Sequence, residues 1–209
     1  MNTEVYLVRH GEPLITNSML GATDSPLSER GWSQLENTFG GLGDIQFDAV
    51  ISSPLSRCAS FAQHYCAEKN LPLAIVEDWK ECDFGEWDGK SYQGLHQKYP
   101  QALSKFYNDP MFNTPPNGEP LKDFCIRVEN ALDKTINRFA GKQIAIVTHA
   151  GVIRTLVAWC LQMDYASGAQ FKRFSVDYAS VTHISIYHAK KIFPQLIRLN
   201  KNFPAEVFA

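Results

Sequence analysis

Four basic side chains stand next to apolar runs of this chain, at positions where a buried strand would end. Arg9 and His10 directly follow the first apolar run. Arg57 lies in the first turn of the helix expected after the second run, and His149 follows a later one. A guanidinium presents a rigid fork of donors that fits phosphate, and a neutral imidazole can act as a nucleophile. These residue types suggest chemistry on a phosphate group.

The strands and helices between these residues decide whether they meet. Runs with the composition of buried strands lie at residues 5–8, 48–52, 73–76 and 144–148. Helical patterns lie at 28–39, 53–70, 119–140 and 149–161, and a closing hairpin is predicted at 181–187 and 196–199. This alternation predicts an α/β three-layer sandwich, with helices flanking a mostly parallel central sheet. Because parallel strands end at one edge, we expect the four basic side chains to converge there.

Two serines are expected to begin helices. Ser28 is predicted to cap the helix over 28–39. Ser53 is predicted to cap the helix over 53–70, with Pro54 at its first helical position. For Ser53 we favour this structural role over contact with a ligand.

The segment over residues 77–120 differs in composition from the rest of the chain. It is rich in aromatic residues, glycines and prolines, and short helices are predicted near 91–98 and 101–107. A long irregular insertion in a compact domain is commonly functional. We therefore expect a cap-like insertion within a single domain over residues 1–209. Glu81 lies in this segment and is a candidate acid for the same site.

The composition argues against several classes of partner. The 209 residues carry a formal net charge of −2, which provides no basic field for nucleic acid or an anionic membrane. No apolar run reaches membrane-spanning length, and the early first strand leads us to expect no signal peptide. The five cysteines are scattered and lack metal-site spacing, as expected of reduced thiols in a cytoplasmic protein. The oligomeric state is not indicated.

The chain resembles the histidine phosphatase superfamily, in the branch that contains cofactor-dependent phosphoglycerate mutase. Six short motifs occur in the order of that family, at residues 9–12 (RHGE), 24–28 (DSPLS), 53–57 (SPLSR), 81–89 (ECDFGEWDG), 117–119 (NGE) and 148–151 (THAG). Each motif alone is short, but the ordered set covers about residues 5–155.

The resemblance implies a phosphomonoester phosphatase that works through a phosphohistidine intermediate. His10 would be the phosphorylated nucleophile, and Glu81 would be the proton donor. Arg9, Arg57 and His149 would form the pocket for the phosphate group. The reaction of this family requires no metal and no other cofactor, so the expected partner is a small-molecule phosphomonoester.

One position departs from the family pattern. The family usually has an asparagine six residues after the nucleophile, where it contacts phosphate. In this chain Thr16 stands at that position, and Asn17 follows it. Either side chain can serve, so both remain candidates for phosphate binding.

Two alternative functions lead to different expectations. Mutases of the superfamily generally have a longer middle insertion with paired arginines, whereas residues 90–120 hold Lys90, Lys98 and Lys105 and no arginine. A non-catalytic module for phosphorylated ligands would not need both histidines and Glu81. A broad-specificity phosphatase remains open as an alternative.

The aromatic residues of the middle segment bear on the leaving group. Phe84, Trp87 and Tyr92 are expected either to line the mouth of the pocket or to pack beneath it. Such a lining favours a bulky, rather flat leaving group with few additional charges. Cys82 is interpreted as a packing residue, and His183 as a structural histidine of a late strand.

Overall fold

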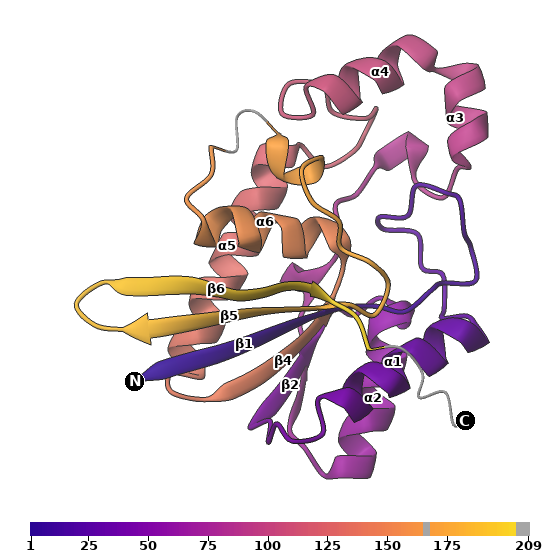
Figure 1. Ribbon diagram of the computed structural model, residues 1–209. Helices are drawn as coiled ribbons and strands as arrows, with labels where there is room; N and C mark the ends of the chain where they lie inside the picture. The colour runs from indigo at the N-terminus through magenta and orange to yellow at the C-terminus, as the bar shows by residue number, and fades with distance from the viewer. Residues whose placement is uncertain (165–167, 204–209) are drawn as a thin grey trace.

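The computed structural model describes residues 1–164 and 168–203, and its centre is a six-stranded sheet (Figure 1). The strands lie in the order β3-β2-β4-β1-β5-β6. The first four in this order are parallel, whereas β5 pairs antiparallel with β1, and β6 pairs antiparallel with β5. Their bounds are β1 Asn2–Arg9, β2 Ala49–Ser52, β3 Leu73–Ile75, β4 Gln143–Thr148, β5 Val181–His188 and β6 Ile192–Lys201.

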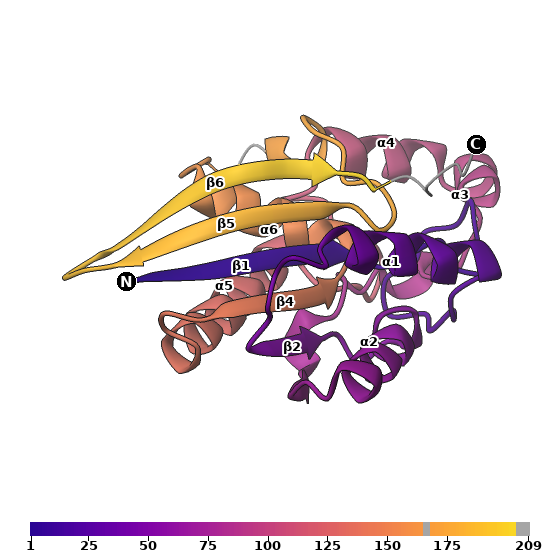
Figure 2. The same cartoon turned by 60° about the horizontal axis from the view of Figure 1, so that its bottom comes forward.

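Helices cover both faces of the sheet (Figure 2). Their bounds are α1 Glu29–Gly41 and α2 Ser56–Lys69 on one face, and α5 Leu121–Arg138 and α6 Ala150–Cys160 on the other. Val5 and Leu7 of β1 pack in the core with α5 and α6, whereas Tyr6 and Val8 pack in the core with α1 and α2. The predicted three-layer α/β sandwich with a mostly parallel sheet is confirmed. Within the described ranges no helix is long and apolar enough to cross a membrane.

Two shorter helices lie beyond the carboxyl edge of the parallel strands (Figure 1). They are α3 (Tyr92–Lys98) and α4 (Pro100–Asn108), at the positions expected from the sequence. They have a small core of their own, in which Trp87, Leu95 and Leu103 are buried together with Met19. The middle segment therefore packs as a separate layer above the edge where the basic side chains were expected to converge.

Of the two serine caps predicted from the sequence, the structure contains the one at the start of α1 but not the one at the start of α2. Ser28 caps α1 as predicted, because its Oγ accepts a hydrogen bond from the Gly31 N–H at 3.0 Å. The prediction for Ser53 is wrong: α2 begins at Ser56, and its N-cap residue Leu55 makes no side-chain cap. The Ser53 hydroxyl is instead the partner of the buried His149 ring, at 2.8 Å from Nε2. The N–H group of Ser56, the first residue of α2, donates to the Asp24 carboxylate at 2.7 Å, so the start of the helix does not depend on Ser53.

The loop after β1 lies in close contact with the first turn of α1. The Ser28 N–H donates to the Glu12 carbonyl oxygen at 2.9 Å. A Cβ atom added at Gly31 would overlap that same oxygen, and one added at Gly11 would overlap the Gly31 carbonyl oxygen. Glycine at these positions lets the two backbones meet directly, which places the loop that follows His10.

We predict opposite effects for two glycine substitutions within α1. Gly31→Ala should lower the free energy of unfolding by about 1–3 kcal/mol, because the added methyl group has no space. Gly40→Ala should be neutral or stabilising by up to about 1 kcal/mol, since its Cβ meets nothing within 4 Å and alanine favours the helix. Urea unfolding of both variants measures the difference. Equal tolerance of the two substitutions would contradict the close contact.

Candidate active site

His10 follows β1 directly and is nearly buried, with 6% of its surface exposed. Its Nδ1 lies 2.7 Å from the Gly11 carbonyl oxygen. Because a carbonyl only accepts, Nδ1 carries the proton, and Nε2 of the neutral ring keeps a free lone pair. Burial, and then the positive charges of Arg9 and Arg57, hold the pKa of His10 well below its usual value of 6.5. The ring is therefore neutral at pH 7 and able to attack through Nε2.

Arg9 is held beside His10 without a carboxylate partner among the described residues. Its Nη1 donates to the Val176 carbonyl oxygen at 2.7 Å, and its Cζ lies 3.9 Å from the ring centroid of Tyr178. Its Nε is buried and has no acceptor in the described part of the chain. Burial lowers the pKa of Arg9, whereas the nearby Tyr178 and Glu81 raise it. An anion beside His10 would complete the set of hydrogen bonds.

His149 and Arg57 lie behind His10 and are fully buried. The two histidine rings are 5.2 Å apart between centroids. Arg57 Nε donates to His149 Nδ1 at 3.3 Å, so Nε2 of the neutral ring donates to Ser53 Oγ at 2.8 Å. Burial, followed by the charge of Arg57, holds the pKa of His149 well below 6.5. The structure thus brings all four predicted basic residues together, although only Arg9 and His10 line the open cavity.

The loop that contains Gly21 and Thr23 orients the guanidinium of Arg57. The Nη1 atom donates to the Thr23 carbonyl oxygen at 2.8 Å, and Nη2 donates to the Gly21 carbonyl oxygen at 2.7 Å. With the bond from Nε to His149, three of the five guanidinium N–H groups are engaged. The remaining two N–H groups donate to no described residue, although Arg57 is fully buried and does not line the cavity in this structure.

Glu81 lies on the opposite side of the cavity and lines it together with His10. One carboxylate oxygen accepts from the Gly151 N–H at 2.9 Å, and the other accepts from the Cys82 N–H at 3.1 Å. A Cβ atom added at Gly151 would overlap the Glu81 carboxylate in its present position, so a larger residue there would displace the Glu81 side chain. The placement of Glu81 in the cavity agrees with its expected role.

Arg127 of α5 fixes the backbone around Glu81. It donates to the carbonyl oxygens of Asp78 and Lys80 at 2.8 and 3.1 Å. Its other N–H groups form a two-point pair with the Glu119 carboxylate at 2.8 and 2.7 Å. Glu119, in the motif at residues 117–119, therefore helps to hold the backbone before Glu81 through Arg127. Arg127 was not identified from the sequence.

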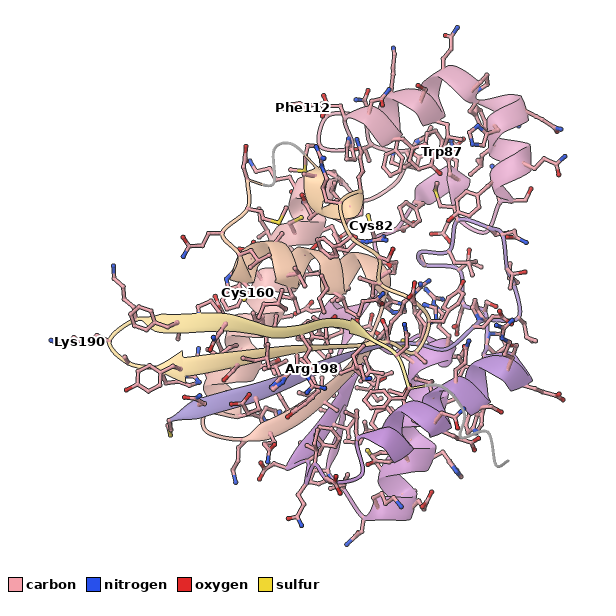
Figure 3. All side chains as sticks on the ribbon, in the orientation of Figure 1. Cys82, Trp87, Phe112, Cys160, Lys190 and Arg198 are labelled. Atoms are coloured by element: carbon pink, nitrogen blue, oxygen red, sulfur yellow. The ribbon has the colours of Figure 1, made fainter. Side chains whose placement is uncertain are left out.

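The cavity above His10 has a volume of about 380 Å³. Aromatic side chains supply much of its lining. They are Phe84, Tyr92, Phe106, Tyr107, Phe171 and Tyr178. Figure 3 shows Cys82 between the sheet and the helices α3 and α4, and Trp87 within the layer of those helices. Phe84 and Tyr92 thus line the pocket, whereas Trp87 does not and is buried in the small core of α3 and α4. A larger hollow of about 750 Å³ between α1 and α2 contains none of the predicted site residues.

Thr16 and Asn17 are not brought into this cavity. Both are exposed, and neither lines it, whereas the next residue, Ser18, does. Asn17 has a left-handed backbone with φ of 53°, and its carbonyl oxygen accepts from the Tyr92 N–H at 3.0 Å. The backbone of this loop is therefore used to attach it to α3.

Arg154 lines the cavity and was missed from the sequence. It lies on α6, one turn after Gly151, so the two residues share a helix face. That spacing was the available signal. Together with Lys172 it gives the pocket more positive charge than the arginine-free middle segment led us to expect.

His183 lies outside the cavity, whereas Cys82 belongs to its lining. His183 stacks on Tyr6 with 4.2 Å between ring centroids, and its Nε2 lies 2.6 Å from the Glu4 carboxylate. Cys82 is buried, and burial raises the pKa of its thiol. In the described ranges no group of three or more His, Cys, Asp and Glu side chains is placed to hold a metal ion.

Comparisons with known proteins agree with this geometry. The family model for the histidine phosphatase superfamily, branch 1, matches residues 5–200. The chain is 30% identical over 161 residues to the adenosylcobalamin/alpha-ribazole phosphatase of Escherichia coli (strain K12), covering 76% of this chain and 79% of that protein. It is 27% identical over 201 residues to phosphoserine phosphatase 1 of Hydrogenobacter thermophilus, covering 94% and 92%. The alpha-ribazole phosphatase structure from Shigella flexneri, 30% identical, matches 95% of this chain and 96% of its own, with a TM-score of 0.81.

We predict that the two buried histidines make the stability pH-dependent between about pH 7 and 5. Each has a folded-state pKa below the unfolded value of 6.5, so the unfolded chain binds more protons. The stability is therefore complete above pH 6.5 and falls as the pH decreases, by at most about 1.4 kcal/mol per pH unit for each histidine. Urea unfolding across this range should show a shallower slope for His10→Gln and for His149→Gln. The exposed His96, changed to Gln, serves as the control and should leave the slope unchanged.

Proposed function

This chain belongs to branch 1 of the histidine phosphatase superfamily and is a phosphoric monoester hydrolase, and we propose that His10 carries the phosphoryl group. The observation that supports this role most directly is the bond from His10 Nδ1 to the Gly11 carbonyl oxygen. It orients the ring and leaves Nε2 unprotonated in the cavity. A neutral imidazole fixed in this way is a competent nucleophile at pH 7.

The proposed reaction has two steps. In the first, His10 Nε2 forms a bond to phosphorus while the ester P–O bond breaks, and Glu81 gives its proton to the leaving oxygen. In the second, Glu81 takes a proton from water as the water oxygen attacks phosphorus. The N–P bond then breaks, and inorganic phosphate and neutral His10 are released. Neither step requires an electron donor or an oxidant.

We propose that three basic groups stabilise the negative charge that develops on the phosphoryl oxygens. Arg9 has unengaged N–H groups beside His10, and Arg57 has two more behind it. His149 accepts a hydrogen bond from Arg57, and its ring centroid lies 5.2 Å from that of His10. Donors that are fixed before the reaction stabilise such a transition state without reorganising, and one donor typically contributes about 10²–10³ in rate.

For the substrate we propose α-ribazole 5′-phosphate or adenosylcobalamin 5′-phosphate, from which the enzyme would remove the 5′-phosphate in cobalamin biosynthesis. The named activities of the Escherichia coli and Shigella flexneri relatives support this choice. The aromatic lining of the cavity also supports it, because a flat base can stack there.

We further propose that residues 77–120 act as a cap of a single phosphatase domain, since Phe84, Tyr92, Phe106 and Tyr107 of that segment line the cavity.

The acid role of Glu81 predicts a dependence on the leaving group. Glu81→Gln should reduce hydrolysis of an alkyl phosphate by about 10²–10⁴-fold, because an alkoxide cannot leave without a proton. Hydrolysis of p-nitrophenyl phosphate should fall much less, since p-nitrophenolate leaves unaided. Steady-state kcat/KM on both substrates measures this. Equal losses, with phosphorylation rate-limiting, would mean that another group is the acid.

The substrate proposal is tested by direct competition. We expect a higher kcat/KM for α-ribazole 5′-phosphate or adenosylcobalamin 5′-phosphate than for phosphoserine, 3-phosphoglycerate or fructose 2,6-bisphosphate. His10→Ala should abolish turnover of all five, and rapid quenching of the wild-type protein without acid should recover labelled phosphate on His10. If one of the three small anionic substrates is preferred, the cobalamin assignment is wrong and the phosphatase assignment remains. Label on a serine or a cysteine would overturn His10 as the nucleophile.

A further inference from the structure

Asp88 places its carboxylate against the loop that holds Arg57. Its two oxygens accept from the backbone N–H groups of Gly21 at 3.2 Å, Ala22 at 2.7 Å and Thr23 at 2.8 Å. A fourth N–H group, that of Phe84, donates to it at 3.1 Å. A carboxylate has about four acceptor positions, so this one is fully engaged with backbone donors.

A single peptide group connects Asp88 with Arg57. Its N–H belongs to Ala22 and donates to Asp88 Oδ2 at 2.7 Å. Its carbonyl oxygen belongs to Gly21 and accepts from Arg57 Nη2, also at 2.7 Å. Hydrogen bonds in series polarise one another, and of these two the bond at Ala22 is exposed while the bond at Gly21 is buried. The negative charge of Asp88 therefore strengthens the acceptor that faces the guanidinium.

Arg57 needs such compensation because it is buried. Its surface is 0% exposed, and within the described part of the chain its bonds go to His149 and to two backbone carbonyl oxygens, not to a carboxylate. A buried charge without a counter-charge is costly. A carboxylate in direct contact would occupy the N–H groups that a phosphate requires. A carboxylate one peptide group away compensates the charge and leaves those N–H groups free.

The same loop is also attached to the middle segment at Met19, just before this contact. The Gly89 N–H donates to the Met19 carbonyl oxygen at 2.7 Å, and the Met19 N–H donates to the Lys90 carbonyl oxygen at 3.0 Å. A displacement of Asp88 with its segment would therefore also move the backbone that orients Arg57.

We propose that Asp88 is the counter-ion and positioning residue of Arg57, acts through the Gly21–Ala22 peptide group, and sets the affinity of the site for the phosphate group. This inference rests on the proposed function in one respect, which is that Arg57 is a cation of the phosphate pocket. Asp88 itself does not touch the substrate. Its whole effect on phosphate binding passes through Arg57, and that distinguishes it from a residue that only stabilises the fold.

A double-mutant cycle on phosphate binding tests the proposal. Calorimetric titration with inorganic phosphate gives Kd for the wild-type protein, Asp88→Asn, Arg57→Gln and the double variant. We expect Asp88→Asn to weaken phosphate binding by about tenfold or more, as for loss of a charge-assisted bond. In the Arg57→Gln background the same substitution should change Kd by less than about twofold. An equal factor in both backgrounds, or no phosphate binding by the wild-type protein, would overturn the proposal.

Two further variants keep the test decisive. Asp83→Asn changes a carboxylate of the same segment that accepts from the Gly85 N–H at 2.8 Å, and it should leave Kd unchanged. A loss equal to that of Asp88→Asn would indicate a general disturbance and overturn the proposal. If Asp88→Asn does not fold, the cycle is run with Asp88→Glu, which keeps the charge but displaces it. Because binding is measured without turnover, activity retained by His10→Ala would refute the proposed nucleophile and leave this test intact.

Discussion

The site depends on holding positive guanidinium groups next to an uncharged histidine in a region that water barely reaches. Arg57 is fully buried, and His10 is nearly so. Burial and these neighbouring charges keep the imidazole neutral. The guanidinium groups are in turn held by backbone carbonyl oxygens, from Val176 for Arg9 and from Gly21 for Arg57. Neutral acceptors orient the cations without cancelling the charge that an incoming phosphate group would meet.

This requirement explains why distant parts of the chain meet at one edge of the sheet. The parallel strands β1, β2 and β4 end there, and they deliver His10, Arg57 and His149 from separate crossovers. The backbone acceptors come from loops that the strands alone do not place. Contacts between Gly11 and Gly31 and between Asp88 and Gly21 fix those loops. Small residues and backbone hydrogen bonds thus determine the precision of the site.

The cavity combines a polar floor with a largely aromatic wall. Arg9, His10 and Glu81 belong to its polar part, to which we assign the proposed phosphoryl transfer, and Phe84, Tyr92 and further aromatic rings supply much of the remaining lining. A relative with 30% identity is named adenosylcobalamin/alpha-ribazole phosphatase, and a relative with 27% identity is named phosphoserine phosphatase 1. Arg154 adds a charge to that wall.

The sequence by itself determined the fold class and the alternation of strands and helices in a mostly parallel sheet. It also gave the approximate residue ranges of the elements of the sandwich. It also determined that His10, Arg9, Arg57 and His149 would meet. Periodicity and strand composition depend on local burial, and parallel strands always end at a common edge. Local chemistry was therefore sufficient for these conclusions.

Only the tertiary structure decided the contacts that depend on distant backbone. Ser53 follows capping rules in sequence, but a buried His149 takes its hydroxyl. Thr16 stands where the family usually has an asparagine, and Asn17 follows it, yet neither side chain lines the cavity, whereas the next residue, Ser18, does. Asp88 and Arg154 had no local signal strong enough to assign them. Their partners are chosen by long-range packing, and no pattern of neighbouring residues encodes which buried polar group a distant loop will satisfy.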